Sequence, residues 1–153
     1  MELDLTRHVA ADPDTVWAVL TDIPEAHRTL SGVLAVEILT SGPYQPGLRW
    51  RETRKMFGMK ATEEMMVLAV EPPRSTTIVA ESGGTEYTTV FTITPDAGGG
   101  STLRMRFGAH TAHAPAVSRV VMSVMGPFAE KSTRRTMEQD LADIAAEAER
   151  RAG

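Results

Sequence analysis

The chain contains no cysteine, and this excludes a disulfide framework, a thiol nucleophile and a cysteine-ligated metal. It has no stretch of about 18 apolar residues, so we expect no membrane span. There is no long basic run and the formal net charge is −4, which argues against a general nucleic-acid-binding protein. The first residues lack a basic segment followed by an apolar one, so we expect no signal peptide. Together these absences predict a cytoplasmic globular protein.

Aromatic residues are also scarce, with four Phe, two Trp and two Tyr against nine Met. Because Met is unbranched and polarizable, it fills irregular gaps and adapts to different contacts. Two interpretations stay open: simple gap filling in a small core, or the lining of a deformable ligand pocket. The remaining composition is ordinary, with 42% hydrophobic and 24% charged residues in 153. This length predicts a single domain spanning residues 1–153.

The N-terminal part predicts one strand followed by two short helices. Polar and apolar residues alternate over 2–9, which is typical of a half-buried strand. Asp12 is expected to cap a helix that begins at Pro13, where the missing N–H costs nothing. A second start motif at Asp22 predicts another short helix that ends near Thr29.

The middle of the chain predicts an antiparallel meander of six further strands. Turns rich in glycine and proline separate the runs, among them Gly83-Gly84, which suits a tight hairpin turn. The expected strands span residues 33–39, 48–56, 60–71, 75–82, 85–94 and 102–113.

The C-terminal part predicts a long amphipathic helix over residues 116–150, because apolar residues recur there at spacings of three and four. Gly126-Pro127 lies inside it and predicts a kink or a break. A lone meander must cover one face, and only this helix is long enough to do so. A twisted sheet curls into a trough, and a single helix is narrower than that trough. We therefore expect an α+β fold with a cavity for a small, largely apolar ligand between sheet and helix.

Several local motifs accompany this order of elements: Val9-Ala10-Ala11-Asp12-Pro13-Asp14-Thr15-Val16-Trp17 with Leu20-Thr21-Asp22, Val70-Glu71-Pro72-Pro73-Arg74, Gly98-Gly99-Gly100-Ser101-Thr102-Leu103 and Met137-Glu138-Gln139-Asp140-Leu141. With them the whole chain resembles the START-like (SRPBCC) helix-grip superfamily, and within it the polyketide cyclase/dehydrase-type branch. The resemblance implies a seven-stranded curved antiparallel sheet around a long C-terminal helix, with two short helices after strand 1. Members include lipid carriers, hormone receptors, aromatase/cyclases and chaperone activators, so the fold alone does not settle function.

Strand parity places candidate ligand-binding residues on the face expected to look toward the helix. On the strand at 48–56 these are Trp50, Glu52, Arg54 and Met56. Because an unpaired buried charge is very expensive, Glu52 and Arg54 must pair, reach solvent or meet a ligand. The planar fork of Arg54 would suit a ligand carboxylate or enolate.

The last two strands supply the expected inner wall of the cavity. Tyr87 and Thr89 are hydrogen-bonding side chains in an apolar surround, a composition typical of a small-molecule site, although core residues bonded to backbone are an open alternative. The other candidate ligand-binding residues from these strands and the helix are Phe91, Met105, Phe107, Val121, Met125 and Phe128.

Other chemistry has little support in the sequence. His110 and His113 fall on opposite faces of a strand, so we expect no metal site, and no motif predicts a cofactor. His27 could act as an acid or base, but a surface histidine is the simpler interpretation. No nucleophile motif is present, and without a distance the carboxylate pairs Glu63-Glu64 and Glu81/Glu86 carry little weight.

Three functions therefore stay open. The first is binding or transport of a small hydrophobic ligand, lipid-like or polyketide-like. The second is a polyketide cyclase or aromatase, in which Arg54 would stabilise an enolate and Tyr87 or His113 would relay a proton. The third is a protein-binding module of the chaperone-activator type that uses the outer sheet face. A homodimer is left open as an assembly.

Overall fold

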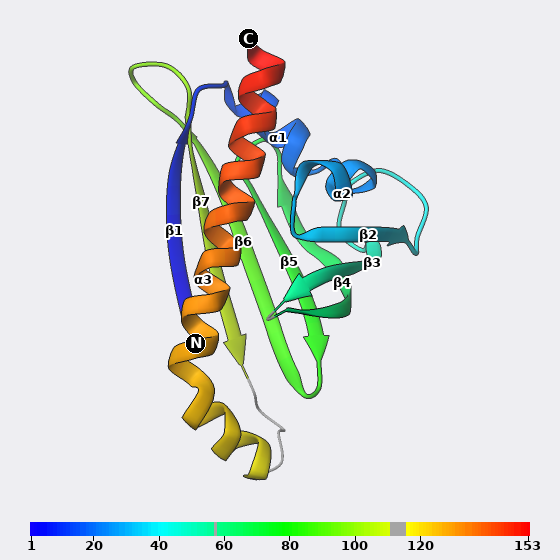
Figure 1. Cartoon of the computed structure of the whole chain (residues 1–153). Coiled ribbons are helices and arrows are strands. Elements are labelled where there is room, and N and C mark those ends of the chain that lie inside the picture. Colours follow the sequence, from blue (N-terminus) through cyan, green and yellow to red (C-terminus); the bar gives the residue numbers. More distant parts are fainter. Residues whose placement is uncertain (57, 111–115) are drawn as a thin grey trace.

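A long C-terminal helix crosses one face of a curved sheet (Figure 1). The computed structural model describes residues 1–56, 58–110 and 116–153, and for residues 56 and 116–128 it describes the backbone alone. The elements in chain order are β1 (Glu2–Val9), α1 (Pro13–Leu20), the short 3-10 helix η1 (Ile23–Glu25), α2 (Ala26–Thr29), β2 (Val33–Ile38), β3 (Arg49–Met56), β4 (Met59–Glu71), β5 (Ser75–Ser82), β6 (Thr85–Pro95), β7 (Ser101–His110) and α3 (Ala116–Ala152).

All neighbouring strands pair antiparallel. Over the described residues seven strands form one sheet in the order β1-β7-β6-β5-β4-β3-β2, so the first strand joins the last one. The chain therefore runs as a meander from β2 to β7 and is closed on one side by β1. The predicted α+β architecture, with short helices between the first two strands, is confirmed.

Local chemistry explains where the first helix and the central hairpin form. The Asp12 side chain accepts a hydrogen bond from the backbone N–H of Thr15 at 2.8 Å, and Pro13 occupies the first turn of α1, as predicted. Gly83 and Gly84 have φ values of 59° and 81°, a conformation that other residues rarely adopt, and they form the tight turn between β5 and β6.

The helix α3 continues through Gly126-Pro127 without a break. Its gold first turns and its orange and red remainder run in different directions, so of the two expected outcomes the helix shows the kink (Figure 1). Proline removes one helical hydrogen bond and crowds the preceding turn, which bends a helix without necessarily ending it.

The hydrophobic core fills one end of the space between the sheet and α3. Here the C-terminal half of α3 packs beside α1 and β1, close to the C-terminus (Figure 1). The core residues at this filled end come from β1, α1, β6, β7 and α3: Val9, Val16, Ile93, Leu103, Leu141, Ala145 and Ala148. At the opposite end, the described side chains leave a cavity.

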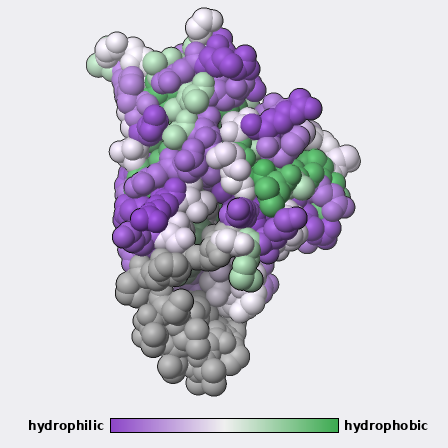
Figure 2. Space-filling view, in the orientation of Figure 1, coloured by the Kyte–Doolittle hydropathy of each residue, from purple (hydrophilic) through white to green (hydrophobic). Residues whose placement is uncertain are grey.

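Figure 2 shows that hydrophilic side chains cover most of the described surface on this side of the molecule. A green, hydrophobic area lies over β2, at the edge of the sheet (Figure 2). The large apolar residues exposed on that strand are Leu34 and Ile38, at 45% and 40%. On this side of the molecule, exposed apolar surface is therefore concentrated at the β2 edge.

Candidate functional site

A cavity of about 990 Å³ lies between the inner face of the sheet, the middle of α3 and the helices α1 and α2. Its volume is at the upper end of the range usual for small-molecule sites, about 300–1,000 Å³. The predicted residues with described side chains all line it: Trp50, Glu52, Arg54, Tyr87, Thr89, Phe91, Met105 and Phe107. The side chains of Met56, Val121, Met125 and Phe128 lie outside the described residues. The predicted location of the cavity is confirmed, and ligand binding by these residues stays a prediction.

The sequence interpretation missed much of the wall. Inner-facing residues of β4 and β5, residues of the two short helices and residues of α3 also line the cavity, among them Ala61, Glu63, Met65, Ile78, Ala80, Leu20, Ile23, Leu30, Thr133, Thr136 and Asp140. A pattern in the sequence pointed to Asp140. It falls among Met137, Leu141 and Ile144, so it is an acid on the apolar stripe of a helix.

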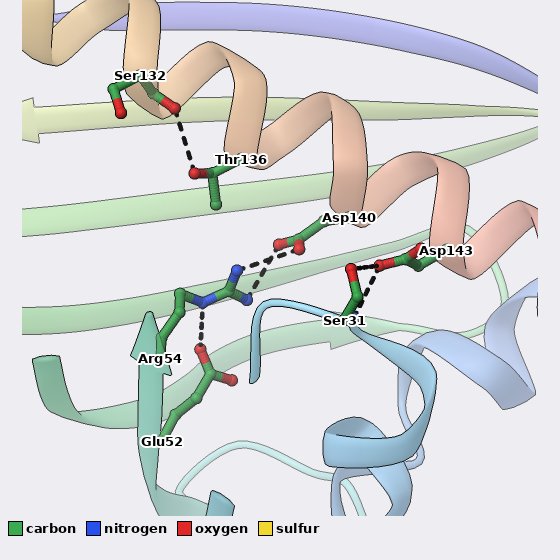
Figure 3. Close-up of polar contacts among 7 residues, drawn as sticks. All are labelled: Ser31, Glu52, Arg54, Ser132, Thr136, Asp140 and Asp143. Carbon is green, nitrogen blue, oxygen red and sulfur yellow. Dashed lines mark hydrogen bonds and ion pairs between the residues drawn. The ribbon is translucent and has the colours of Figure 1, made fainter. Parts of the chain in front are cut away.

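A buried ion pair connects the sheet to the helix at the cavity wall (Figure 3). Arg54 on β3 donates from Nη1 and Nη2 to the two carboxylate oxygens of Asp140 on α3, at 3.1 and 3.0 Å. Its Nε donates to Glu52 at 3.2 Å. The side chains of Arg54, Glu52 and Asp140 are only 14%, 13% and 9% exposed. Glu52 and Arg54 thus pair, one of the three predicted outcomes, and Asp140 is an additional partner.

Burial and neighbouring charges shift the pKa values of Asp140 and Arg54. Burial raises the pKa of Asp140 to about 6; Arg54 opposes this shift, whereas Glu52 and Asp143 add to it. For Arg54, burial works against the charged form, but Asp140 and Glu52 outweigh it and the pKa is raised. Arg54 is therefore permanently charged, and Asp140 can change protonation just below neutral pH.

Glu63 and Tyr87 form a second polar region of the wall. Glu63 lies directly opposite Glu52 in the β3–β4 register, and burial followed by the Glu52 charge raises its pKa. Burial and then the Glu63 charge raise the pKa of Tyr87, while its hydrogen bond with Thr85 opposes the shift. The Tyr87 ring stacks on Phe107 with centroids 5.8 Å apart.

The two carboxylate pairs considered from the sequence do not form sites. Glu64 pairs with Arg49, a residue of the opposite sheet face from Glu52 and Arg54, so Glu63 and Glu64 lie on opposite sides of the sheet. Glu81 and Glu86 face each other across β5 and β6, but both are exposed to solvent.

The loop before β2 is fixed against the helix beside the ion pair (Figure 3). Ser31 donates from its backbone N–H and its hydroxyl to Asp143 of α3, at 2.8 and 2.9 Å. Gly32 lies so close to Arg54 that a Cβ there would be 3.3 Å from Nη1. At the end of the sheet that borders the cavity, which we call the hollow end, polar contacts therefore connect the sheet and this loop to α3.

Trp50 is the most buried polar-bearing side chain of the cavity wall. It is 2% exposed, and among the described residues its indole N–H has no hydrogen-bond acceptor.

The other chemistry considered from the sequence finds little support at the wall. His27 is exposed and is not among the described residues of the wall. The described side chains include no group of three or more His, Asp or Glu that could hold a metal ion. Among the described residues, no helix is both long enough and apolar enough to cross a membrane.

Solved structures with the same architecture cover essentially the whole chain. A protein of Thermus thermophilus is 14% identical, with 100% of both chains covered and a TM-score of 0.83. The Zhui aromatase/cyclase of Streptomyces sp. R1128 is 21% identical, with 100% of this chain and 96% of that chain covered and a TM-score of 0.76. A START superfamily protein of Mycobacterium smegmatis is 15% identical, with 99% and 96% covered and a TM-score of 0.73. At these identities the likeness establishes the fold, and the helix-grip prediction is confirmed.

No curated protein sequence matches the chain significantly. The sequence profile of one family, described as polyketide cyclase / dehydrase and lipid transport, matches residues 1–149. The match extends over nearly the whole chain and agrees with the resemblance found in the sequence motifs. The chain therefore belongs to the polyketide cyclase/dehydrase and lipid transport family.

Proposed function

We propose that this protein binds a small hydrophobic molecule in the cavity between the sheet and α3, and that it sequesters or carries this molecule. The observation that carries the proposal is the cavity of about 990 Å³ with a mainly apolar wall and a few convergent polar groups. Filling an apolar cavity of this size restores the dispersion contacts that its lining lacks. Family membership supports the same hydrophobic-ligand role.

The proposed ligand contacts divide into two kinds. Phe91, Met105 and Phe107 offer apolar surface, and Met side chains adapt to differently shaped guests. Tyr87, Thr89 and Glu63 offer hydrogen-bonding groups that would orient the guest. Selectivity would thus come from the shape of the cavity and from a small number of polar positions.

The proposal can be tested with N-phenyl-1-naphthylamine, a neutral apolar fluorophore. We expect saturable binding to the wild type and at least about tenfold weaker binding to a variant that carries Ala80→Leu and Ala109→Leu, because both positions line the cavity. The matched control is Ala69→Leu, at an exposed position on β4 that is not among the described residues of the wall. Absence of binding to the wild type, or equal affinity in all three proteins, would contradict the proposal.

Native mass spectrometry gives an independent test. Protein purified gently from its own host should carry a substoichiometric additional mass that disappears on denaturation and is lost from the Ala80→Leu and Ala109→Leu variant. Since a ligand that binds only the folded state raises its stability, the extracted compound should also raise the unfolding temperature of stripped protein. A compound that fails to do so is not the ligand.

One observation favours catalysis as a second candidate function. The cavity wall contains Asp140, whose pKa is raised to about 6 by burial, in contact with the permanently charged Arg54. A group that titrates near neutral pH can exchange a proton with a bound poly-β-keto chain. His113, the other proton relay considered, lies outside the described residues. The test is reconstitution with a minimal polyketide synthase: a cyclase changes the ratio of cyclised products, and Asp140→Asn abolishes that change.

A further inference from the structure

The charged side chains of the cavity wall are mostly acidic. Among the described residues, the carboxylates at the wall belong to Asp22, Glu52, Glu63, Glu130 and Asp140, whereas the side-chain cations are Arg54 and Lys60. Lys60 is exposed. In the β3–β4 pairing it lies opposite Lys55, on the outer face of the sheet. Arg54 is therefore the side-chain cation of the described inner wall that an anionic ligand would have to use; the N-terminal ammonium of Met1, also at the wall, donates to the Ala109 carbonyl.

Arg54 is already engaged. Three of its N–H groups donate to Asp140 and Glu52, and this geometry is bidentate toward Asp140. A ligand carboxylate could approach the guanidinium only by displacing a carboxylate that is itself buried. Displacement would leave Asp140 or Glu52 without its partner inside the protein, which is strongly unfavourable. Among its described inner side chains, the wall thus offers an incoming anion no uncommitted cation.

Glu63 is in the opposite situation. It lies on the inner face, opposite Glu52, and within the described part of the chain no hydrogen bond or ion pair reaches its carboxylate. Burial and the Glu52 charge raise its pKa, and the Arg54 charge opposes this only in part, so Glu63 is a partly desolvated acceptor. A positively charged group placed in the cavity would relieve this electrostatic penalty.

A second unsatisfied polar group lies on the same pair of strands. The indole N–H of Trp50 is buried and has no acceptor among the described residues, although Trp50 lines the cavity. Trp50 pairs in register with Met65, and Glu52 pairs with Glu63, so Trp50 and Glu63 belong to neighbouring positions of one wall. Buried polar groups in folded proteins are nearly always paired, so the Trp50 N–H marks a position for a hydrogen-bond acceptor on the guest, whereas the half-buried Glu63 carboxylate marks a position for a donor or a cation. The described residues contain no cluster suited to a metal ion, which favours an organic guest.

We propose that the cavity selects apolar molecules that carry an amine, whose ammonium group pairs with Glu63, and that it discriminates against apolar carboxylates. This inference rests on the proposed ligand-binding function and specifies its ligand class. The ammonium group would lie between β4 and the neighbouring Tyr87, with the apolar body along Phe91 and Phe107. The guest thus supplies the cationic partner that Glu63 lacks among the described residues.

The test compares three probes of equal chain length near neutral pH: octylammonium, 1-octanol and octanoate, each titrated calorimetrically into the protein. We expect octylammonium to bind about tenfold or more tightly than octanoate, with octanol between them. Glu63→Gln should reduce the affinity for octylammonium to that for octanol and leave octanol unchanged. Glu64→Gln is the matched control, because this adjacent carboxylate lies on the outer face in a pair with Arg49.

The outcomes separate this inference from the function on which it rests. Equal or tighter binding of octanoate than of octylammonium overturns the amine preference, while binding of any of the three probes leaves the cavity function standing. If none of the probes binds, and N-phenyl-1-naphthylamine does not bind either, the ligand-binding function itself fails. An equal loss of octylammonium affinity in Glu63→Gln and Glu64→Gln would assign the preference to general surface charge and would also overturn the inference. Urea unfolding of both variants verifies that they fold.

Discussion

The two ends of the space between the sheet and α3 are built from the same strands and the same helix, yet one is filled and the other is hollow. At the filled end Ile93, Leu103, Leu141 and Ala145 belong to one hydrophobic cluster, and these side chains are almost fully buried. Further along the same β7 strand, Phe107 is only half-buried and lines the cavity. The alternation of side chains is unchanged along the strand, and what differs is the surface that faces it.

The difference lies in how each end is held together. The filled end is held by close apolar packing, in which each added contact contributes to stability. The hollow end is held by Arg54, Asp140 and Ser31, whose polar contacts bridge sheet, loop and helix. Polar bridges keep the walls apart at a fixed distance without filling the space between them. The protein therefore obtains its stability at one end and a place for a guest at the other.

The largest expected effect is loss of stability at the filled end. Leu103→Ala should lower the free energy of unfolding by about 4 kcal/mol, because Leu103 is fully buried and its removal leaves a new void. Phe107→Ala, further along the same face of β7, should cost about 1–2 kcal/mol, since it enlarges a cavity that already exists. Urea denaturation measures both. Equal losses would show that the two ends do not differ in packing.

The second effect concerns pH at the hollow end. Asp140 ionises near 3.8 when unfolded but near 6 in the folded protein, so between these values the folded state holds more protons. The free energy of unfolding therefore falls as pH rises through this interval, by about 3 kcal/mol from this group, and is constant above it. Asp140→Asn should remove this part of the slope. Its curve should be flatter than that of the wild type between about pH 4 and 6, and parallel curves would contradict the assignment.

Much of the fold could be predicted from the sequence because it follows from local rules. The cap at Asp12, the Gly83-Gly84 turn and the alternation of apolar residues each act over a few positions. The outcome at Gly126-Pro127 could not be decided, because a proline's effect depends on whether the surrounding helix tolerates the bend. On β4, the register shift between Val67 and Ala69 changes which alternate residues face inward. No local sequence pattern predicts this shift.

Residues of the cavity wall could be predicted only where the alternation of side chains along a single strand was enough to assign them to the inner face. Trp50, Glu52 and Arg54 share a face by alternation alone, and the pairing of two opposite charges there follows from the cost of burial. The partner Asp140 is 86 residues away from Arg54, so its role depends on how the helix lies across the sheet. Its position on the apolar stripe was a sign that could have been used. Glu63 required the β3–β4 register, which places it opposite Glu52.

A third effect compares added volume at the two ends. Ala145→Leu should destabilise the protein by about 2 kcal/mol, because Ala145 is fully buried on α3 and the extra atoms must displace close-packed neighbours. Ala80→Leu should change stability by less than about 0.5 kcal/mol, since its side chain extends the wall of an open cavity. Thermal and urea unfolding measure both. If Ala80→Leu is as costly as Ala145→Leu, the cavity is not free space.

The smallest effect concerns the contact between Gly32 and Arg54. Ala at position 32 would place its Cβ 3.3 Å from Nη1, and Arg54 cannot move away freely because Asp140 and Glu52 hold its guanidinium. Gly98 offers the matched control: a Cβ there meets nothing within 4 Å, and Gly98 is not among the residues with positive φ. Gly98→Ala should be neutral or slightly stabilising because it restricts the unfolded chain, whereas Gly32→Ala should be destabilising, a difference of about 1 kcal/mol. Because the cost arises only while Arg54 is held, combining Gly32→Ala with Asp140→Asn should reduce it. An undiminished cost in the double variant would mean that the polar bridge does not fix Arg54, and that the hollow end is kept open by other contacts.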